Sequence, residues 1–249
     1  MNKLWVIAKK DIRESFRSRS TYLYIIVLFV LSFSYFTSYS ARMDSIIAAK
    51  ASAADIRQEA QSILNAFCAT LPMMFSIWVC TIFSTYSVVV EKAKRNLESL
   101  MVTPVNLKQI WMGKTLAVTL PSIIIGLGAS IVVYVVLGIT RVDPQIGSFL
   151  IPQAVPLLTA FILVPLLVFS IVSVVLYLQL TISNPRFANF IFLGIFFLLF
   201  FGINALAGFG ILINYAVVFL GVIVICGAVS LLLSRSLTKE KVLLSSKEQ

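Results

Sequence analysis

Hydrophobic and polar positions occur in long blocks along this chain, and not in the short periods of a soluble domain. Five stretches contain no Asp, Glu, Lys or Arg: residues 20–41, 60–90, 115–140, 144–185 and 187–234. About 20 apolar residues in a helix cross the roughly 30 Å hydrocarbon core of a bilayer. Each of the first three stretches therefore predicts one membrane-spanning helix.

The last two stretches are longer than a single span. A single helix over residues 187–234 would measure roughly 72 Å, so this stretch predicts two spans with a turn near residues 208–210. For residues 144–185 the length fits one span or two. We interpret this stretch as a peripheral segment followed by one span over 156–182. One glycine and two prolines interrupt the apolar helical pattern in the first part of the stretch.

The predicted spans and the basic residues together give a topology. Six spans are predicted, over residues 20–41, 68–90, 115–139, 156–182, 187–207 and 211–234. Of the 20 Lys and Arg residues, 16 fall on the side that holds both termini, including the tail 235–249. Because Lys and Arg collect in cytoplasmic loops, both termini are expected in the cytoplasm and the chain in the cell membrane.

Composition supports a lipid environment and limits the classes of partner. The chain has 249 residues, of which 59% are hydrophobic and 12% charged, and its mean hydropathy is +0.99. The net charge of +10 is explained by basic flanks that face the anionic headgroups of the lipid bilayer. No nucleic-acid partner is expected.

Two further segments show helical spacing. Trp5, Ile12 and Phe16 share one face of a helix predicted over residues 1–19, with charged side chains on the other face. Such a helix lies in the membrane interface, either as a topology anchor or as an elbow helix that also touches a cytoplasmic partner. On the outer side, residues 42–67 predict an external helix that leads into the second span.

Sites for catalysis or metal binding are hard to assemble from this sequence. The chain has no His, and its three Cys lie singly within apolar stretches. Gly113-Lys114-Thr115 resembles the end of a phosphate-binding loop, but position 108 is Lys where that motif requires Gly. We therefore expect a protein that is not an enzyme and binds no cofactor. The uncharged spans argue against a proton-driven carrier and favour a hydrophobic or amphiphilic passenger.

Residues 91–114 are a densely charged passage between the second and third predicted spans. A helix that continues from the second span is expected to stop near Thr103-Pro104. Asn106, with Gln109 three residues later, predicts the cap of a second helix. The predicted product is a short helical hairpin below the membrane with apolar side chains among charged ones. Such a mixture indicates a partner surface, while a hairpin that lies flat on the headgroups fits the same pattern.

The hairpin also resembles the signature of the membrane subunits of type-2 ABC exporters. The residues that carry this resemblance are Glu91, Leu97-Glu98-Ser99-Leu100, Thr103-Pro104-Val105 and Gly113-Lys114. The stretch from Ala8 to Glu14, in which a basic pair precedes an acidic residue, an apolar residue and an arginine, resembles the opening of the same family.

Together with the six predicted spans, this resemblance implies an all-α integral membrane protein and a single transmembrane domain over residues 1–249. It implies an N-terminal elbow helix, a cytoplasmic coupling hairpin, a second membrane subunit (identical or paralogous) and separate cytoplasmic ABC ATPase subunits that bind ATP and Mg²⁺. The expected ATPase-coupling surface consists of Glu91, Lys94, Arg95, Leu97, Glu98, Leu100, Thr103, Pro104 and Val105. The alternative function is a membrane scaffold or regulatory protein that recruits a cytoplasmic partner without transport.

Overall fold

The computed structural model describes five continuous parts of the chain: residues 3–18, 53–93, 106–147, 150–182 and 214–237. It also describes scattered residues between positions 21 and 45 and between positions 184 and 198. Within these described residues every regular element is a helix and there is no strand.

The helices form a few continuous rods. The α-helices are α1 (Lys3–Arg17), α3 (Ala53–Ser84), α4 (Glu91–Ala93), α6 (Leu107–Leu137), α7 (Asp143–Ile146), α8 (Ala154–Leu158), α9 (Val164–Thr181) and α11 (Tyr215–Ser236). Three π-helical turns connect pairs of these helices without a break. η1 (Thr85–Val90) joins α3 to α4, η2 (Gly138–Val142) joins α6 to α7, and η3 (Thr159–Leu163) joins α8 to α9.

Four helical stretches are long and apolar enough to cross a bilayer. They are Ile56–Val90, Leu107–Thr140, Ala154–Thr181 and Tyr215–Ser236. The predicted spans 20–41 and 187–207 lie largely outside the described residues, so a total of six spans stays a prediction. The chain is thus a helical protein with several candidate membrane spans.

The helix that contains the predicted second span begins well before that span. α3 starts at Ala53 and continues through η1 into α4, so part of the predicted external segment belongs to the same rod. The 35 residues of Ile56–Val90 would measure about 52 Å, which exceeds the roughly 30 Å of hydrocarbon. This rod is therefore long enough to extend beyond the hydrocarbon core.

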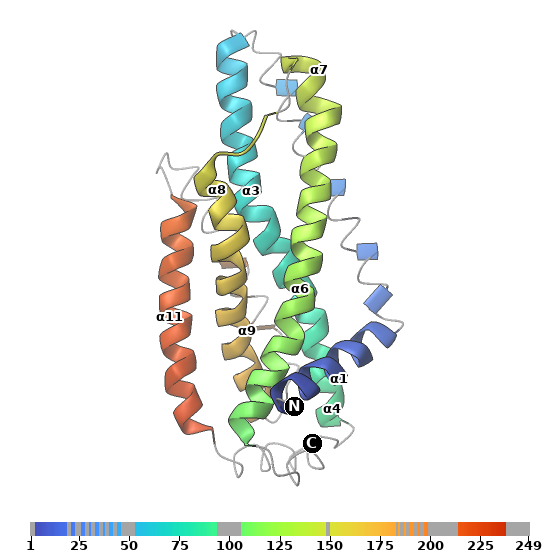
Figure 1. Ribbon diagram of the computed structural model, residues 1–249, viewed down its shortest axis with the longest axis vertical. Helices are drawn as coiled ribbons and strands as arrows, with labels where there is room; N and C mark the ends of the chain where they lie inside the picture. Colours follow the sequence, from blue (N-terminus) through green and yellow to red (C-terminus); the bar gives the residue numbers. More distant parts are fainter. Residues whose placement is uncertain are drawn as a thin grey trace.

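Three of the candidate spans form the core of the bundle. α3, α6 and α9 pack against one another, and α11 lies along α9 (Figure 1). Phe219 is the one buried residue of α11. Phe75 and Phe83 of α3 and Leu176 of α9 are completely or almost completely buried. α1 crosses the lower end of α6, near α4 (Figure 1). We call this end, where α1 and α4 lie, the base of the bundle.

α3 and α6 approach most closely where a glycine removes the side chain between them. A Cβ atom at Gly126 would lie 2.6 Å from the backbone nitrogen and 2.8 Å from the Cα atom of Ser76. Real side chains do not tolerate such distances to a backbone. Position 126 of α6 therefore requires glycine because the backbone of α3 occupies the space of a Cβ.

The cap that the sequence predicts at Asn106 is confirmed. Asn106 is the N-cap of α6, and its backbone N–H donates to Gln109 Oε1 at 3.4 Å. The helix then continues to Leu137 without interruption, and so it includes the third predicted span. The segment 94–105, which holds the rest of the predicted hairpin, lies outside the described residues.

Candidate functional site

Three charged side chains from three different elements meet inside the base of the bundle. Lys114 of α6 places its Nζ 3.0 Å from Asp11 Oδ2 of α1 and 2.6 Å from Glu91 Oε2 at the start of α4. The exposed fractions of these side chains are 0% for Lys114, 2% for Asp11 and 7% for Glu91. We call Asp11, Glu91, Lys114 and the adjoining Ser87 the ion-pair cluster.

Ser87 of η1 adds two hydrogen bonds to this cluster. Its Oγ donates to Asp11 Oδ2 at 2.8 Å, and its backbone carbonyl accepts from Lys114 Nζ at 2.5 Å. Asp11 Oδ1 is buried and has no hydrogen-bond partner among the described residues. A cavity of about 390 Å³ adjoins the cluster and is lined by Asp11, Glu14, Ser15, Arg17, Ser18, Tyr86, Ser87, Val90 and Glu91.

The sequence of α1 explains why Asp11 reaches this position. Ala8, Asp11 and Ser15 are spaced by three and four residues, which places them on one face of a helix. Their exposed fractions are 0%, 3% and 3%, so this small and polar face is the one that packs on the bundle. Trp5 is exposed instead, and Phe16 is partly exposed while its ring packs edge-to-face on Phe83 of α3, with ring centroids 5.3 Å apart.

The charge in the cluster is nearly balanced by a half-exposed lysine outside it. The buried part holds two carboxylates and one ammonium group. Lys10 Nζ lies 3.6 Å from Glu91 Oε1 and 3.8 Å from Glu14 Oε1. Because removal of one partner leaves a buried charge without compensation, loss of Lys114 should cost about 3–5 kcal/mol. The two ion pairs of Lys114 therefore stabilise the contact of α6 with α1 and with α4.

A second buried lysine ties the same region to α9. Lys92 Nζ donates to the backbone carbonyls of Gln179 at 3.4 Å, Leu180 at 3.5 Å and Ile182 at 2.6 Å, at the carboxyl end of α9. A helix carboxyl end carries partial negative charge and attracts a cation. Burial lowers the pKa of Lys92 to about 8. Glu91 and Lys92 thus connect α4 to different neighbours.

A third connection at the base joins α6 directly to α9. The indole N–H of Trp111 donates to the backbone carbonyl of Ser173 at 2.9 Å, and both atoms are buried. Gln179 Nε2 of α9 donates to Ser84 Oγ of α3 at 3.4 Å. These bonds act together with the ion-pair cluster, so α1, α3, α4, α6 and α9 are all linked by polar contacts at the base.

The predicted site residues fall into two groups in this structure. Glu91 is buried in the ion-pair cluster and pairs with Lys114. The other residues of the predicted coupling surface lie outside the described residues: Lys94, Arg95, Leu97, Glu98, Leu100, Thr103, Pro104 and Val105. Of the predicted elbow residues, Trp5 is 53% exposed, Phe16 is 39% exposed and Ile12 is partly buried.

Sequence reasoning missed Asp11, Ser87 and Lys114 as members of one site. The sequence placed Lys114 in a Gly-Lys pair at the start of the third predicted span, and the structure shows that its side chain is fully buried and held by two carboxylates. A signal was available, since Glu91 directly follows one charge-free stretch and Lys114 directly precedes the next. Two adjacent antiparallel spans place such residues at the same membrane depth.

Chemically, the cluster can transmit force and fix helix positions. Among the described residues, no group of three or more His, Cys, Asp or Glu side chains is arranged to hold a metal ion. Two members of the cluster flank the segment 94–105 in the sequence, because Glu91 precedes it by three residues and Lys114 follows it by nine. The ion-pair cluster therefore joins the helices on both sides of that segment to α1.

Comparison with known proteins identifies the relatives of this chain. The family model described as ABC-2 family transporter protein matches residues 5–242. This match includes α1 from Trp5 onward, the ion-pair cluster and all four candidate spans. The comparison with curated proteins found no match.

Proposed function

Because the chain belongs to the ABC-2 family of transporter proteins, we propose that it is the permease subunit of an ATP-driven exporter. It forms the translocation pathway with a second membrane subunit of the same or a paralogous kind. Separate cytoplasmic ABC ATPase subunits hydrolyse ATP with Mg²⁺. The observation that carries this proposal is the ion-pair cluster, which joins both flanks of the segment 94–105 to the N-terminal helix.

The coupling step follows from these connections. ATP binding closes the ATPase subunits and displaces the cytoplasmic segment 94–105, where Lys94, Arg95 and Glu98 are the expected contact residues. The displacement reaches α3 through Glu91 and α6 through Lys114. α1 follows because Asp11 is bound to Lys114. Such rigid-body motion of linked helices can switch a cavity between two packed states.

The position of α1 supports its role as an elbow helix. Its polar face is buried against α6 and η1, while Trp5, Val6 and Phe16 remain exposed. Lys9 and Arg13 are exposed on the same side of the helix. A helix at the end of membrane spans that exposes a tryptophan beside basic side chains is suited to the bilayer interface. With both termini in the cytoplasm, this interface is that of the inner leaflet of the cell membrane.

The passenger of this exporter is expected to be hydrophobic or amphiphilic. The described spans contain no charged side chain between Ala60 and Val90 or between Thr115 and Thr140. Charged side chains inside spans typically mark the path of an ion or a strongly polar solute. A drug, a peptide or a lipid-linked molecule does not.

The test uses the chain together with the ATPase that copurifies with it in mild detergent. The double charge reversal Lys94→Glu and Arg95→Glu should lower transport of a fluorescent lipophilic dye into proteoliposomes by about tenfold, the effect of roughly 1.4 kcal/mol at the contact. The matched control is Lys239→Glu with Lys241→Glu in the C-terminal tail, which should leave transport near its wild-type rate.

Two results would contradict the proposal. One is unchanged dye transport per ATP hydrolysed after the reversal at Lys94 and Arg95, which would remove the coupling role of the segment. The other is purification of a chain free of any ATPase across several mild detergents. That result would favour a membrane scaffold that recruits a different cytoplasmic partner.

A further inference from the structure

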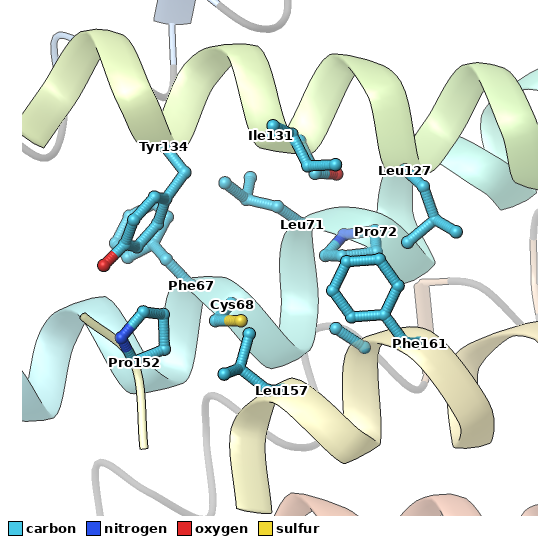
Figure 2. A pocket seen from close by; sticks show the side chains of 12 residues that line it. Phe67, Cys68, Leu71, Pro72, Leu127, Ile131, Tyr134, Pro152, Leu157 and Phe161 are labelled. Atoms are coloured by element: carbon cyan, nitrogen blue, oxygen red, sulfur yellow. The ribbon is translucent and has the colours of Figure 1, made fainter. Parts of the chain in front are cut away.

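An apolar cavity lies between three of the candidate spans, far from the ion-pair cluster. Its volume is about 300 Å³, which is the lower end of the range for ligand pockets. Cys68 and Pro72 of α3, Ile131 of α6, and Leu157 and Phe161 of the rod formed by α8 and η3 surround it (Figure 2). Cys68 precedes Glu91 by 23 residues on one continuous rod, so the cavity is roughly 35 Å from the cluster.

The cavity offers an occupant only apolar surface. Ser130 lines it, but the Oγ of Ser130 donates to the carbonyl of Gly126 at 2.7 Å. Tyr134 lines it as well, and its hydroxyl donates to the carbonyl of Leu150 at 2.5 Å. A polar occupant would lose its hydrogen bonds to water without gaining others here. An occupant of this cavity must therefore be a hydrocarbon group.

The rim of the cavity faces the surroundings of the bundle. Ile131 is 48% exposed and Phe161 is 51% exposed, and both belong to candidate spans. Exposed apolar side chains on a membrane span contact lipid tails. The cavity is therefore open sideways to the bilayer, where acyl chains are the most abundant hydrocarbon groups.

Polar groups mark one end of the cavity. Asn65 and Gln61 lie on the same side of α3 as Cys68, about one and two turns further toward its amino end. Gln61 Nε2 donates to the carbonyl of Ile151 at 2.9 Å, and Asn65 Oδ1 accepts from the backbone N–H of Gln153 at 3.0 Å. The surface thus changes from polar to apolar along α3, as a lipid does from its glycerol group to its chain.

From these observations we propose that the cavity binds one acyl chain of a bilayer phospholipid. The chain enters between Ile131 and Phe161 and packs against Cys68, Pro72 and Leu157. The glycerol and headgroup stay at the polar end beside Gln61 and Asn65. The bound lipid is retained as a part of the folded protein, whatever molecule the protein transports.

Native mass spectrometry of the full chain in mild detergent tests this proposal. After phosphatidylcholine is added and excess lipid removed, the wild-type chain should retain one lipid per chain. Leu157→Trp fills the cavity and should raise the Kd for this lipid about tenfold, which corresponds to a loss of roughly 1.4 kcal/mol, so the lipid-bound fraction should fall. The matched control is Leu158→Trp, since Leu158 is adjacent, 56% exposed and outside the cavity. This control should keep the lipid.

Photo-crosslinking places the lipid within the structure. The chain is reconstituted into nanodiscs of phosphatidylcholine with a diazirine in one acyl chain, irradiated and digested. Residues 67–72 should be labelled several-fold more strongly than the lipid-facing residues 224–225 of α11, which report contact with bulk lipid. Leu157→Trp should abolish this excess. Equal labelling of both regions, or an excess that survives in Leu157→Trp, would overturn the proposal.

The thiol of Cys68 gives a readout that needs no mutation inside the cavity wall. In a chain with Cys80→Ala and Cys226→Ala, Cys68 should react with N-ethylmaleimide several-fold more slowly after phosphatidylcholine is added to delipidated protein. An unchanged rate would overturn the proposal. Protection by a single-chain detergent but not by phosphatidylcholine would also overturn it, because the cavity would then select another amphiphile.

Discussion

At the scale of single residues, the two buried lysines of the base differ in their partners. Lys114 is held by the carboxylates of Asp11 and Glu91. Lys92 donates to three backbone carbonyls of the α9 end, and no carboxylate pairs with it in the described part of the chain. Carbonyls compensate a buried charge less than carboxylates do. Burial therefore lowers the pKa of Lys92 to about 8.

This lowered pKa predicts a pH dependence of stability. Between the folded pKa of about 8 and the ordinary value of 10.5, the unfolded chain binds a proton at Lys92 that the folded chain has released. The contribution of Lys92 to the free energy of unfolding should therefore rise with pH in this window, by about 1.4 kcal/mol per pH unit. The measurement is thermal unfolding in detergent from pH 7 to 10, with Lys92→Met subtracted at each pH.

The conservative variant Lys92→Arg provides the control. Arginine stays charged throughout this range, so the difference between Lys92→Arg and Lys92→Met should not change with pH. Below pH 8 the difference between wild type and Lys92→Met should also be flat, because the lysine is protonated in both states. If the stability difference between wild type and Lys92→Met were also independent of pH above pH 8, the prediction would be wrong. The α9 carbonyls would then stabilise the ammonium group of Lys92 as well as water does.

Sequence alone could predict some of these residues and not others. Glu91 was predicted as functional because it closes a charge-free stretch and begins a family-like motif. Its burial and its partners could not be predicted, because they depend on how α1 packs across the base. Asp11 was noted in the sequence only as the acidic residue of the family-like stretch from Ala8 to Glu14, without a partner. Only the packing of α1 on α6 and η1 shows that it points inward.

At the scale of helices, the hydrophobic pattern predicted the presence of helices better than their ends. Charge-free stretches mark where hydrocarbon begins and ends, whereas a helix continues for as long as its backbone hydrogen bonds do. α3 therefore starts at Ala53, before its predicted span, and α6 starts at Leu107 and enters the third predicted span without a break. The end that local chemistry does fix, the cap at Asn106, was predicted correctly.

The contact between α3 and α6 predicts that one glycine substitution is costly. Gly126→Ala places a Cβ against the backbone of Ser76, and α6 can accept it only by moving away. Overpacking of this kind costs about 1–3 kcal/mol. Thermal unfolding in detergent should therefore show a clearly lowered midpoint for this variant.

Gly128→Ala on the same helix is the matched control. A Cβ at Gly128 meets no atom within 4 Å, and alanine favours the helix over glycine by up to about 1 kcal/mol. Its unfolding midpoint should equal or exceed that of the wild type. If the two variants behaved alike, the close approach of α3 and α6 would not describe the protein in solution.

At the scale of the whole molecule, the two ends of the bundle are built differently. The base is joined by charges and hydrogen bonds among α1, α3, α4, α6 and α9. The opposite half contains the apolar cavity between α3, α6 and the α8–η3 segment, where few polar bonds connect the helices. The helices at the base are thus held to one another by specific polar contacts. In the opposite half the helices can repack and break few hydrogen bonds.

This difference predicts that α1 depends on one carboxylate for its place in the bundle. Asp11→Asn keeps the shape of the side chain but removes its charge, and it weakens the bonds to Lys114 and Ser87. Loss of a hydrogen bond to a charged group costs about 1.5–3 kcal/mol, which corresponds to roughly 10- to 100-fold faster amide exchange in α1. Hydrogen exchange followed by mass spectrometry should show this change in α1 and little change in α9.

The control is Glu14→Gln, because Glu14 pairs with Lys10 at 3.8 Å through a side chain that is 59% exposed. An exposed pair of this kind contributes little to stability, so exchange in α1 should stay near the wild-type rate. If α1 couples ATP hydrolysis to transport, Asp11→Asn should also lower dye transport per ATP while Glu14→Gln should not. Faster exchange with unchanged transport would mean that the ion-pair cluster holds the bundle together but does not transmit the motion of the ATPase.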